Sequence, residues 1–205
     1  MFILFVALLA PFFSSFANII ECKLSNNIFK HPATMIFYIS LMNCLFMPLL
    51  LFFGIPTLPA PGAVPFYFLL AFIDVAYLYP YYKAMKVIDT SIVSALFSLG
   101  QITIPIMTYL FLDERLRESQ YAGFLLIIAA SIVLSINDFK MPKLNRAFYY
   151  MVFVSLLRAF YVVLQKYTFK EDDNWINLII YVNIFSFLLP FLLFLHKKSA
   201  GYLEF

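Results

Sequence analysis

Long apolar stretches alternate with short polar segments along the chain. Charged residues, Pro or Gly bound each stretch, and the stretches run near residues 2–22, 33–54, 63–83, 90–112, 119–137, 146–168 and 174–195. A helix crosses the hydrocarbon core of a bilayer with about 20 apolar residues, and no water there satisfies the backbone. The pattern therefore predicts an all-α, polytopic transmembrane helical bundle of about seven spans, without a soluble domain between them.

The composition also indicates that lipid surrounds most of the protein. Of 205 residues, 64% are hydrophobic and only 12% are charged, whereas soluble domains keep about 25% charged residues. We therefore expect the lipid bilayer of a plasma or inner membrane to be the main partner. The net charge of +3 and the scattered loop charges give no reason to expect nucleic acid. The first stretch lacks basic residues before it, so it is interpreted as a retained span.

Two pairs of stretches resemble each other. Residues 190–194 (Pro-Phe-Leu-Leu-Phe) match residues 48–52 (Pro-Leu-Leu-Leu-Phe), and residues 158–165 align with residues 14–21. A unit that starts at the first stretch and recurs at the sixth contains five helices, and an odd number inverts the second copy in the membrane. We therefore expect one complete five-helix repeat over 1–137 and the first two helices of a second, inverted repeat over 146–195.

A sequence motif extends over residues 84–136. A stretch rich in small residues and containing a proline is followed by a Glu-Arg-Leu turn and a glycine-led stretch; the matching residues are 84–91, 94–96, Pro105-Ile106, 111–116, Gln120 and Gly123. In this order the segment resembles the EamA-type module of the drug/metabolite transporter superfamily. The resemblance implies a ten-helix carrier of two inverted repeats, which moves small metabolites or drugs by alternating access.

The chain is expected to lack the last three helices of that pattern. One alternative function is therefore a truncated, non-transporting membrane protein or assembly partner, and a homodimer is a further possibility. No organic cofactor or metal is expected, because the sequence has no metal-ligand spacing, phosphate-binding loop, nucleophile elbow or carboxylate pair. A membrane-embedded enzyme is disfavoured for the same reason.

Two charged residues lie in the middle of expected spans, Asp74 in 63–83 and Arg158 in 146–168. Each costs about 2.5–3.5 kcal/mol at a helix centre on insertion scales. We expect both to face one cavity, where they bind a charged substrate or neutralise each other. A purely structural ion pair, or an arginine that extends to the membrane surface, fits the sequence equally well.

Polar residues also follow one face of the fourth stretch. Spacings of 3, 4, 3, 4 and 3 separate its members, which are Ser91, Ser94, Ser98, Gln101, Pro105 and Thr108. Such a face lines either a pathway or a close helix contact, and the amide of Gln101 favours the pathway. The candidate substrate contacts are Asp74, Gln101, Arg158, Tyr77, Ser14 and Asn18; the remaining residues of this face are candidate pathway residues.

Two further expectations concern packing and orientation. Ala122, Gly123, Ala129 and Ala130 in the fifth stretch are typical of close helix packing. Nine basic residues lie in the loops after the first, third, fifth and seventh stretches, and four lie in the other loops. The positive-inside rule places the larger set in the cytoplasm, whereas many members of the resembled family have cytoplasmic termini, so the orientation stays open.

Overall fold

The computed structural model describes residues 2–87, 90–97, 99–115, 117–135 and 146–195. Each apolar stretch expected from the sequence is helical in its described part, and no strand occurs among the described residues. The elements are α1 (Phe2–Asn27), α2 (Pro32–Phe46), the 3-10 helix η1 (Met47–Phe52), α3 (Val64–Met85), α4 (Thr90–Phe97), α5 (Leu99–Leu112), α6 (Glu118–Ser135), α7 (Arg146–Asp172) and α8 (Trp175–Leu195). The expected all-α fold is confirmed.

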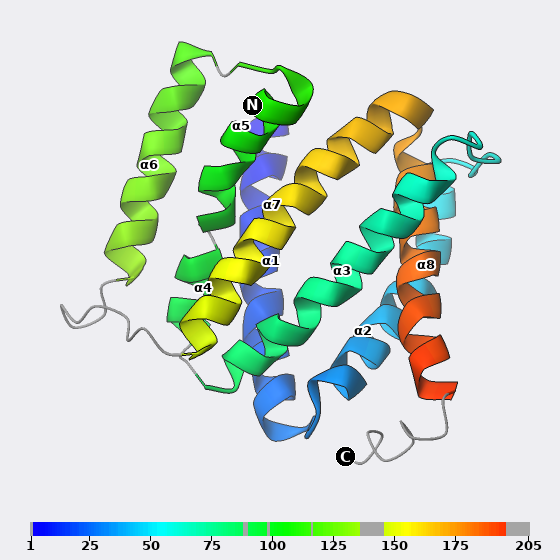
Figure 1. Cartoon of the computed structure of the whole chain (residues 1–205), viewed down its shortest axis with the longest axis horizontal. Coiled ribbons are helices and arrows are strands. Elements are labelled where there is room, and N and C mark those ends of the chain that lie inside the picture. Colours follow the sequence, from blue (N-terminus) through cyan, green and yellow to red (C-terminus); the bar gives the residue numbers. More distant parts are fainter. Residues whose placement is uncertain (1, 88–89, 98, 116, 136–145, 196–205) are drawn as a thin grey trace.

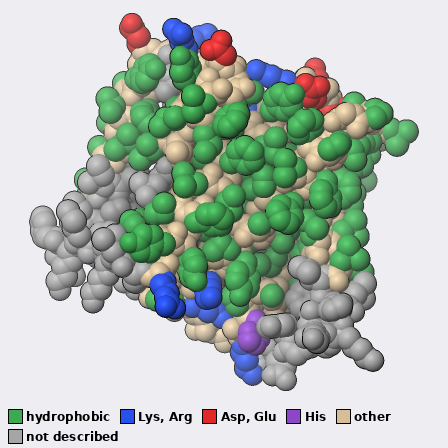
Figure 2. Space-filling model, viewed as in Figure 1, with side chains coloured by type: hydrophobic (Ala, Val, Ile, Leu, Met, Phe, Trp, Pro, Cys, Tyr) green, Lys and Arg blue, Asp and Glu red, His purple; other side chains and the backbone are tan. Residues whose placement is uncertain are grey.

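Within the described part of the chain, four helical segments are long and apolar enough to cross a membrane: Pro32–Phe52, Val64–Met85, Arg146–Asp172 and Trp175–Leu192. Figure 2 shows hydrophobic side chains over the middle of the molecule and charged side chains at two opposite edges. This distribution fits a bundle whose middle faces hydrocarbon and whose ends face water. The figure of seven crossings stays a prediction.

Helices α3 and α7 form the centre of the bundle. Helix α3 packs against α7 and α8, α5 packs against α7, and α2 packs against α8 (Figure 1). Two separate clusters of buried apolar residues hold this arrangement together. The first joins α2, α3, α4 and α7 around Met35, Tyr82 and Met151. The second joins α3, α7 and α8 around Tyr67, Leu70 and Leu178.

The two clusters leave a short polar interval on both central helices. Helix α3 contributes residues up to Ile73 to the second cluster and residues from Tyr81 onward to the first. On α7, Val154 belongs to the first cluster and Tyr161 to the second. Asp74 and Arg158 occupy the two intervals, so the only charges in the middle of these helices lie between two apolar layers.

Helices α5 and α7 approach each other closely at Gly100. A Cβ atom added to Gly100 would lie 2.7 Å from the carbonyl oxygen of Ser155. The Ser155 hydroxyl lies 2.7 Å from the Leu96 carbonyl oxygen and 2.8 Å from that of Met151, so it can donate to either. A glycine and a serine thus make the tight contact typical of membrane helices, because small side chains let two backbones approach.

The expectation of close packing in the fifth stretch is wrong at three of its four residues, and the side chain of the fourth, Ala130, lies outside the described part of the structure. Ala122, Gly123 and Ala129 are exposed on α6, and a Cβ added to Gly123 would meet no atom within 4 Å. Helix α6 lies at the edge of the bundle (Figure 1) and contacts α4 and α5, but these three residues lie on its exposed side.

The two glycines therefore give a matched test of packing. We expect Gly100→Ala to destabilise the protein by about 1–3 kcal/mol, because the new methyl group overlaps the Ser155 carbonyl. Gly123→Ala should be neutral or slightly stabilising, since alanine is the better helix former. Thermal unfolding of both variants in detergent checks this; equal effects would contradict the α5–α7 contact.

Candidate functional site

Asp74 and Arg158 meet near the middle of α3 and α7. The Arg158 Nη1 atom lies 3.8 Å from Asp74 Oδ1, which is an ion pair but too long for a hydrogen bond. The Arg158 side chain is 36% exposed and the Asp74 side chain 23% exposed, although both lie between apolar layers. The pair is therefore not closed by a hydrogen bond, and part of each side chain is left uncovered by the described residues.

Side chains from three helices surround the pair. The Arg158 guanidinium lies 4.7 Å from the centre of the Tyr161 ring and 5.6 Å from that of Tyr77, within the range of cation–π attraction. The Tyr77 and Ser186 hydroxyls lie near enough to the Asp74 carboxylate to stabilise its charge. Ser186 is buried, yet its Oγ atom does not reach hydrogen-bonding geometry with any described residue. Aromatic rings thus stabilise the charge of Arg158, and hydroxyl groups stabilise that of Asp74. The Ser186 hydroxyl keeps a hydrogen-bond donor that no described residue accepts.

Most of the polar face expected on the fourth stretch lies outside the described residues. The structure does not describe Ser98 or the side chains of Ser91, Ser94 and Gln101. Pro105 and Thr108 are described, and they line a cavity near one end of α5 rather than the ion pair. Their role in a pathway stays a prediction.

The candidates on α1 do not join the pair. Ser14 is exposed and Asn18 is half-buried. No hydrogen bond or ion pair between described residues connects either of them to Asp74 or Arg158. Their proposed contact with substrate stays a prediction, and nothing in the geometry adds to it.

Tyr161 and Ser186 were not among the residues expected at the site. Tyr161 follows Arg158 by three residues and lies on the same face of α7, so helical spacing alone could have identified it. Ser186 comes from α8, and only the packing of α8 against α3 brings it to Asp74. The spacing of residues within one helix cannot predict a contact between two different helices.

A polar network ties one end of α3 to the α7–α8 turn. The Tyr67 hydroxyl donates to Asp172, and the Asn177 amide donates to Asp172 Oδ2 at 3.1 Å and to Thr57 Oγ1 at 2.9 Å. The Thr57 backbone N–H donates in return to Asn177 Oδ1 at 2.9 Å. Tyr67 and Asn177 are fully buried, so the network fixes the segment before α3 against the start of α8.

The other end of α3 is tied to α1 by a simpler contact. The Tyr82 hydroxyl donates to Glu21 Oε2 at 3.2 Å. Tyrosine–carboxylate hydrogen bonds therefore hold α3 at both ends, with the Asp74–Arg158 pair between them.

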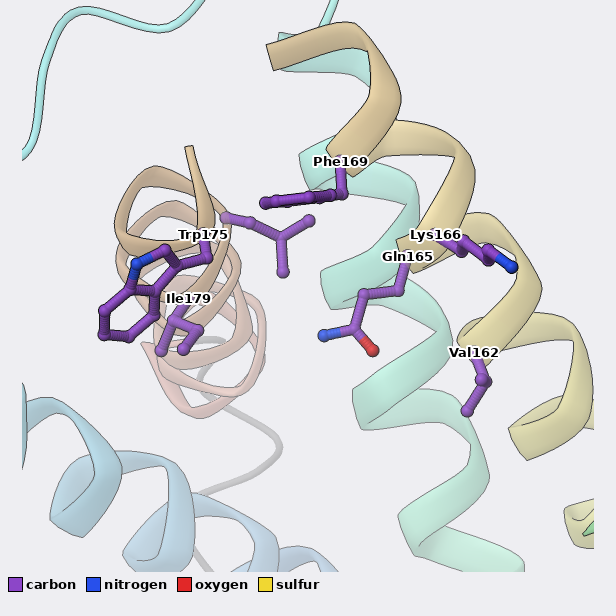
Figure 3. A pocket seen from close by; sticks show the side chains of 7 residues that line it. Val162, Gln165, Lys166, Phe169, Trp175 and Ile179 are labelled. Carbon is purple, nitrogen blue, oxygen red and sulfur yellow. The ribbon is translucent and has the colours of Figure 1, made fainter. Parts of the chain in front are cut away.

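Among the cavities lined by described residues, two lie beside the C-terminal part of α7. One, of about 320 Å³, lies between α7 and α8. Figure 3 shows Phe169 and Trp175 on its wall, with Gln165 pointing into it and the Lys166 ammonium group directed away. The other, of about 490 Å³, lies between α5, the start of α6 and α7; its lining residues are Ile104, Pro105, Thr108, Glu114, Arg115, Arg117, Gln120, Val162 and Lys166.

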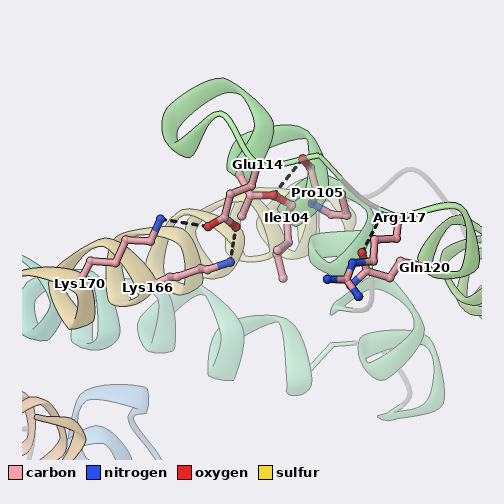
Figure 4. A network of polar contacts seen from close by, with 8 residues as sticks. Ile104, Pro105, Glu114, Arg117, Gln120, Lys166 and Lys170 are labelled. Atoms are coloured by element: carbon pink, nitrogen blue, oxygen red, sulfur yellow. Dashed lines mark hydrogen bonds and ion pairs between the residues drawn. The ribbon is translucent and has the colours of Figure 1, made fainter. Parts of the chain in front are cut away.

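A charged cluster borders this second cavity (Figure 4). Glu114 accepts hydrogen bonds from Lys166 and, at 3.0 Å, from Lys170. These two ammonium groups hold the pKa of the Glu114 carboxyl below its ordinary value of 4.5. The cluster joins the loop after α5 to the end of α7.

Comparison with known proteins gives one family. The model of the EamA-like transporter family matches residues 1–136, which is more than half of the chain. No curated protein matches the sequence.

The Glu114 cluster should make stability depend on pH. A carboxylate whose pKa is depressed by folding stabilises the folded state above its ordinary pKa, and that contribution disappears as the pH falls through the folded value. We therefore expect Glu114→Gln to melt at a lower temperature than the unchanged protein at neutral pH. This difference in melting temperature should vanish well below pH 4.5 and become smaller in high salt. Glu118→Gln, at an exposed position on the same end, is the control. A deficit that is constant with pH would contradict the cluster.

The central ion pair should show energetic coupling. We expect Asp74→Asn or Arg158→Gln alone to cost about 1–3 kcal/mol, because each leaves one charge without its partner. The double variant should recover part of the sum, by about 0.5–3 kcal/mol. Unfolding in mixed lipid–detergent bicelles measures all four proteins; strictly additive losses would show that the two side chains do not interact.

Proposed function

The chain belongs to the EamA-like transporter family of integral membrane proteins, and on that premise we propose that it moves a small metabolite or drug by alternating access around the Asp74–Arg158 pair. Family membership supports a membrane transporter of the drug/metabolite type. The location of the binding site and the mechanism are the new parts of the proposal.

The observation that supports this site most strongly is the loose ion pair itself. Charged residues in the middle of a span are costly and are usually retained for function. Asp74 and Arg158 are 3.8 Å apart and partly exposed, between two apolar clusters of the same helices. A tight structural pair would instead be expected to hydrogen-bond and to exclude solvent.

The arrangement can bind a charged or dipolar substrate without first creating a new charge in the membrane. A dipolar substrate can place its anionic group at Arg158 and its cationic group at Asp74, so that both side chains keep a partner and the net charge of the site is unchanged. The Tyr77 and Tyr161 rings offer faces for an apolar or aromatic part. Ser186 supplies the unused hydroxyl.

Alternating access requires that the two ends open in turn. In this proposal the Tyr67–Asp172–Asn177 network closes one end and the Tyr82–Glu21 hydrogen bond closes the other. Both closures involve α3, so a tilt of this one helix against α7 and α8 lengthens one closure while it keeps the other. The closure at the Tyr67 end contains more hydrogen bonds, so that end is expected to open less readily.

Uptake into proteoliposomes tests the proposal. The probes are radiolabelled lysine, aspartate and phenylalanine, a nucleoside monophosphate and the organic cation tetraphenylphosphonium. We expect at least one probe to enter faster than into protein-free vesicles, and Asp74→Asn and Arg158→Gln to lower its initial rate by about tenfold or more.

Matched controls separate function from insertion. Arg146→Gln removes an exposed arginine from the same helix as Arg158, and Asp113→Asn removes an exposed aspartate from a loop. Both should retain most of the uptake. Unchanged uptake by well-inserted Asp74→Asn and Arg158→Gln would refute the site, and no uptake of any probe above protein-free vesicles would count against transport of these substrate classes.

A further inference from the structure

We propose that the cavity between α5, α6 and α7 binds an anionic phospholipid, with its headgroup at Arg115 and Arg117 and an acyl chain along α5 and α7. This cavity is separate from the Asp74–Arg158 pair. The proposal concerns a lipid ligand and does not depend on the transported substrate.

The cavity is amphipathic along its length. Its polar end lies at the loop after α5, where Glu114, Arg115 and Arg117 line it. Its other end is lined by Ile104, which precedes the last residue of α5 by eight positions. At 1.5 Å per residue this is about 12 Å toward the middle of the bundle. A ligand that fills it must therefore be charged at one end and apolar at the other.

The wall beyond the charged end is apolar. Ile104 and Pro105 come from α5 and Val162 comes from α7. The Thr108 hydroxyl is already within 3.0 Å of the carbonyl oxygens of Ile104 and Pro105, so it presents mainly its methyl group to a ligand. In Figure 4, Ile104 and Pro105 lie between the Glu114 cluster and Arg117.

The charge at the mouth favours an anion. Three cationic side chains line it (Arg115, Arg117 and Lys166) against one carboxylate (Glu114). That carboxylate already has two ammonium partners, Lys166 and Lys170. No carboxylate of the described chain forms an ion pair with either arginine, and both arginines are exposed.

The hydrogen bonds between described residues of the loop do not engage the guanidinium of Arg117. Gln120 Oε1 accepts from the Arg117 backbone N–H at 2.7 Å, so this bond fixes the main chain and not the side chain. Arg115 lies over the Tyr109 ring with its guanidinium carbon 5.7 Å from the ring centre. Arginine binds phosphate oxygens through paired N–H donors, and basic pockets between membrane helices are typical sites for anionic headgroups.

A soluble anion would use only the mouth of the cavity. The volume of about 490 Å³ and the apolar wall formed by α5 and α7 would stay empty around a phosphate ion. In a lipid bilayer the ligand that combines a phosphate with a hydrocarbon chain at this depth is a phospholipid. We therefore assign the occupant as phosphatidylglycerol or another phospholipid with net negative charge.

Native mass spectrometry of the full chain in detergent tests this assignment. The protein is titrated with phosphatidylglycerol, with phosphatidylcholine of the same acyl chains, and with glycerol 3-phosphate as the soluble headgroup. We expect phosphatidylglycerol to bind most tightly and glycerol 3-phosphate not to bind detectably. Arg115→Gln and Arg117→Gln should each weaken phosphatidylglycerol binding by about fivefold, and phosphatidylcholine binding much less.

The control removes two charges from the opposite end of the molecule, one more than either single arginine variant. Lys23→Gln with Lys30→Gln changes two exposed lysines there and should leave the preference for phosphatidylglycerol intact. Equal affinity for the two lipids, or equal losses in the lysine and arginine variants, would overturn the proposal. Glycerol 3-phosphate binding as tight as that of phosphatidylglycerol would also overturn it and would indicate a soluble-anion site.

An apolar variant tests the acyl-chain part separately. Ile104→Trp should narrow the cavity and reduce the affinity for both phospholipids while leaving the arginines in place. If this variant does not fold, the arginine variants still decide the proposal. Full phosphatidylglycerol affinity in a folded Ile104→Trp would contradict an acyl chain along α5.

Discussion

The cost of placing charge in hydrocarbon is the constraint on which this structure depends. Asp74 and Arg158 can enter the middle of the bundle because each provides the counter-charge of the other and because Tyr77 and Tyr161 lie against the guanidinium. Each charge alone would cost about 2.5–3.5 kcal/mol. The apolar clusters on either side of the pair pack α3 against its neighbours and so hold the two charged residues opposite each other.

Helix α3 connects this pair to both ends of the molecule. Tyr67 near its start and Tyr82 near its end each donate a hydrogen bond to a carboxylate on another helix. Asp172 stands at the end of α7, and Glu21 stands toward the end of α1. Helix α3 thus carries Asp74 at its middle and, near each end, a tyrosine whose hydrogen bond closes that end of the molecule. This arrangement gives the proposed alternating access a physical basis, because a tilt of α3 can lengthen the contact at one of its ends while the contact at the other end is kept.

The sequence predicted the helices and the two central charges well, because both follow from the chemistry of single residues. An apolar run of sufficient length is helical in lipid, and a charge in its middle must find a partner. Contacts between helices were much less predictable. Gly100 has no flanking pattern that distinguishes it from Gly123, yet one touches the Ser155 carbonyl and the other meets no neighbour. Small residues permit close packing, but only the arrangement of the helices determines where it occurs.

The central claim is that a water-filled route reaches the Asp74–Arg158 pair. The most direct measurement is the reaction of a membrane-impermeant methanethiosulfonate reagent with Asp74→Cys in reconstituted vesicles, in a chain whose Cys22 and Cys44 are replaced by Ser. The new thiol should react from the aqueous phase, and a transported substrate should slow the reaction. A thiol that stays unreactive in the folded protein, while the same reagent labels a cysteine placed at exposed Asp113, would show that the pair is enclosed and purely structural.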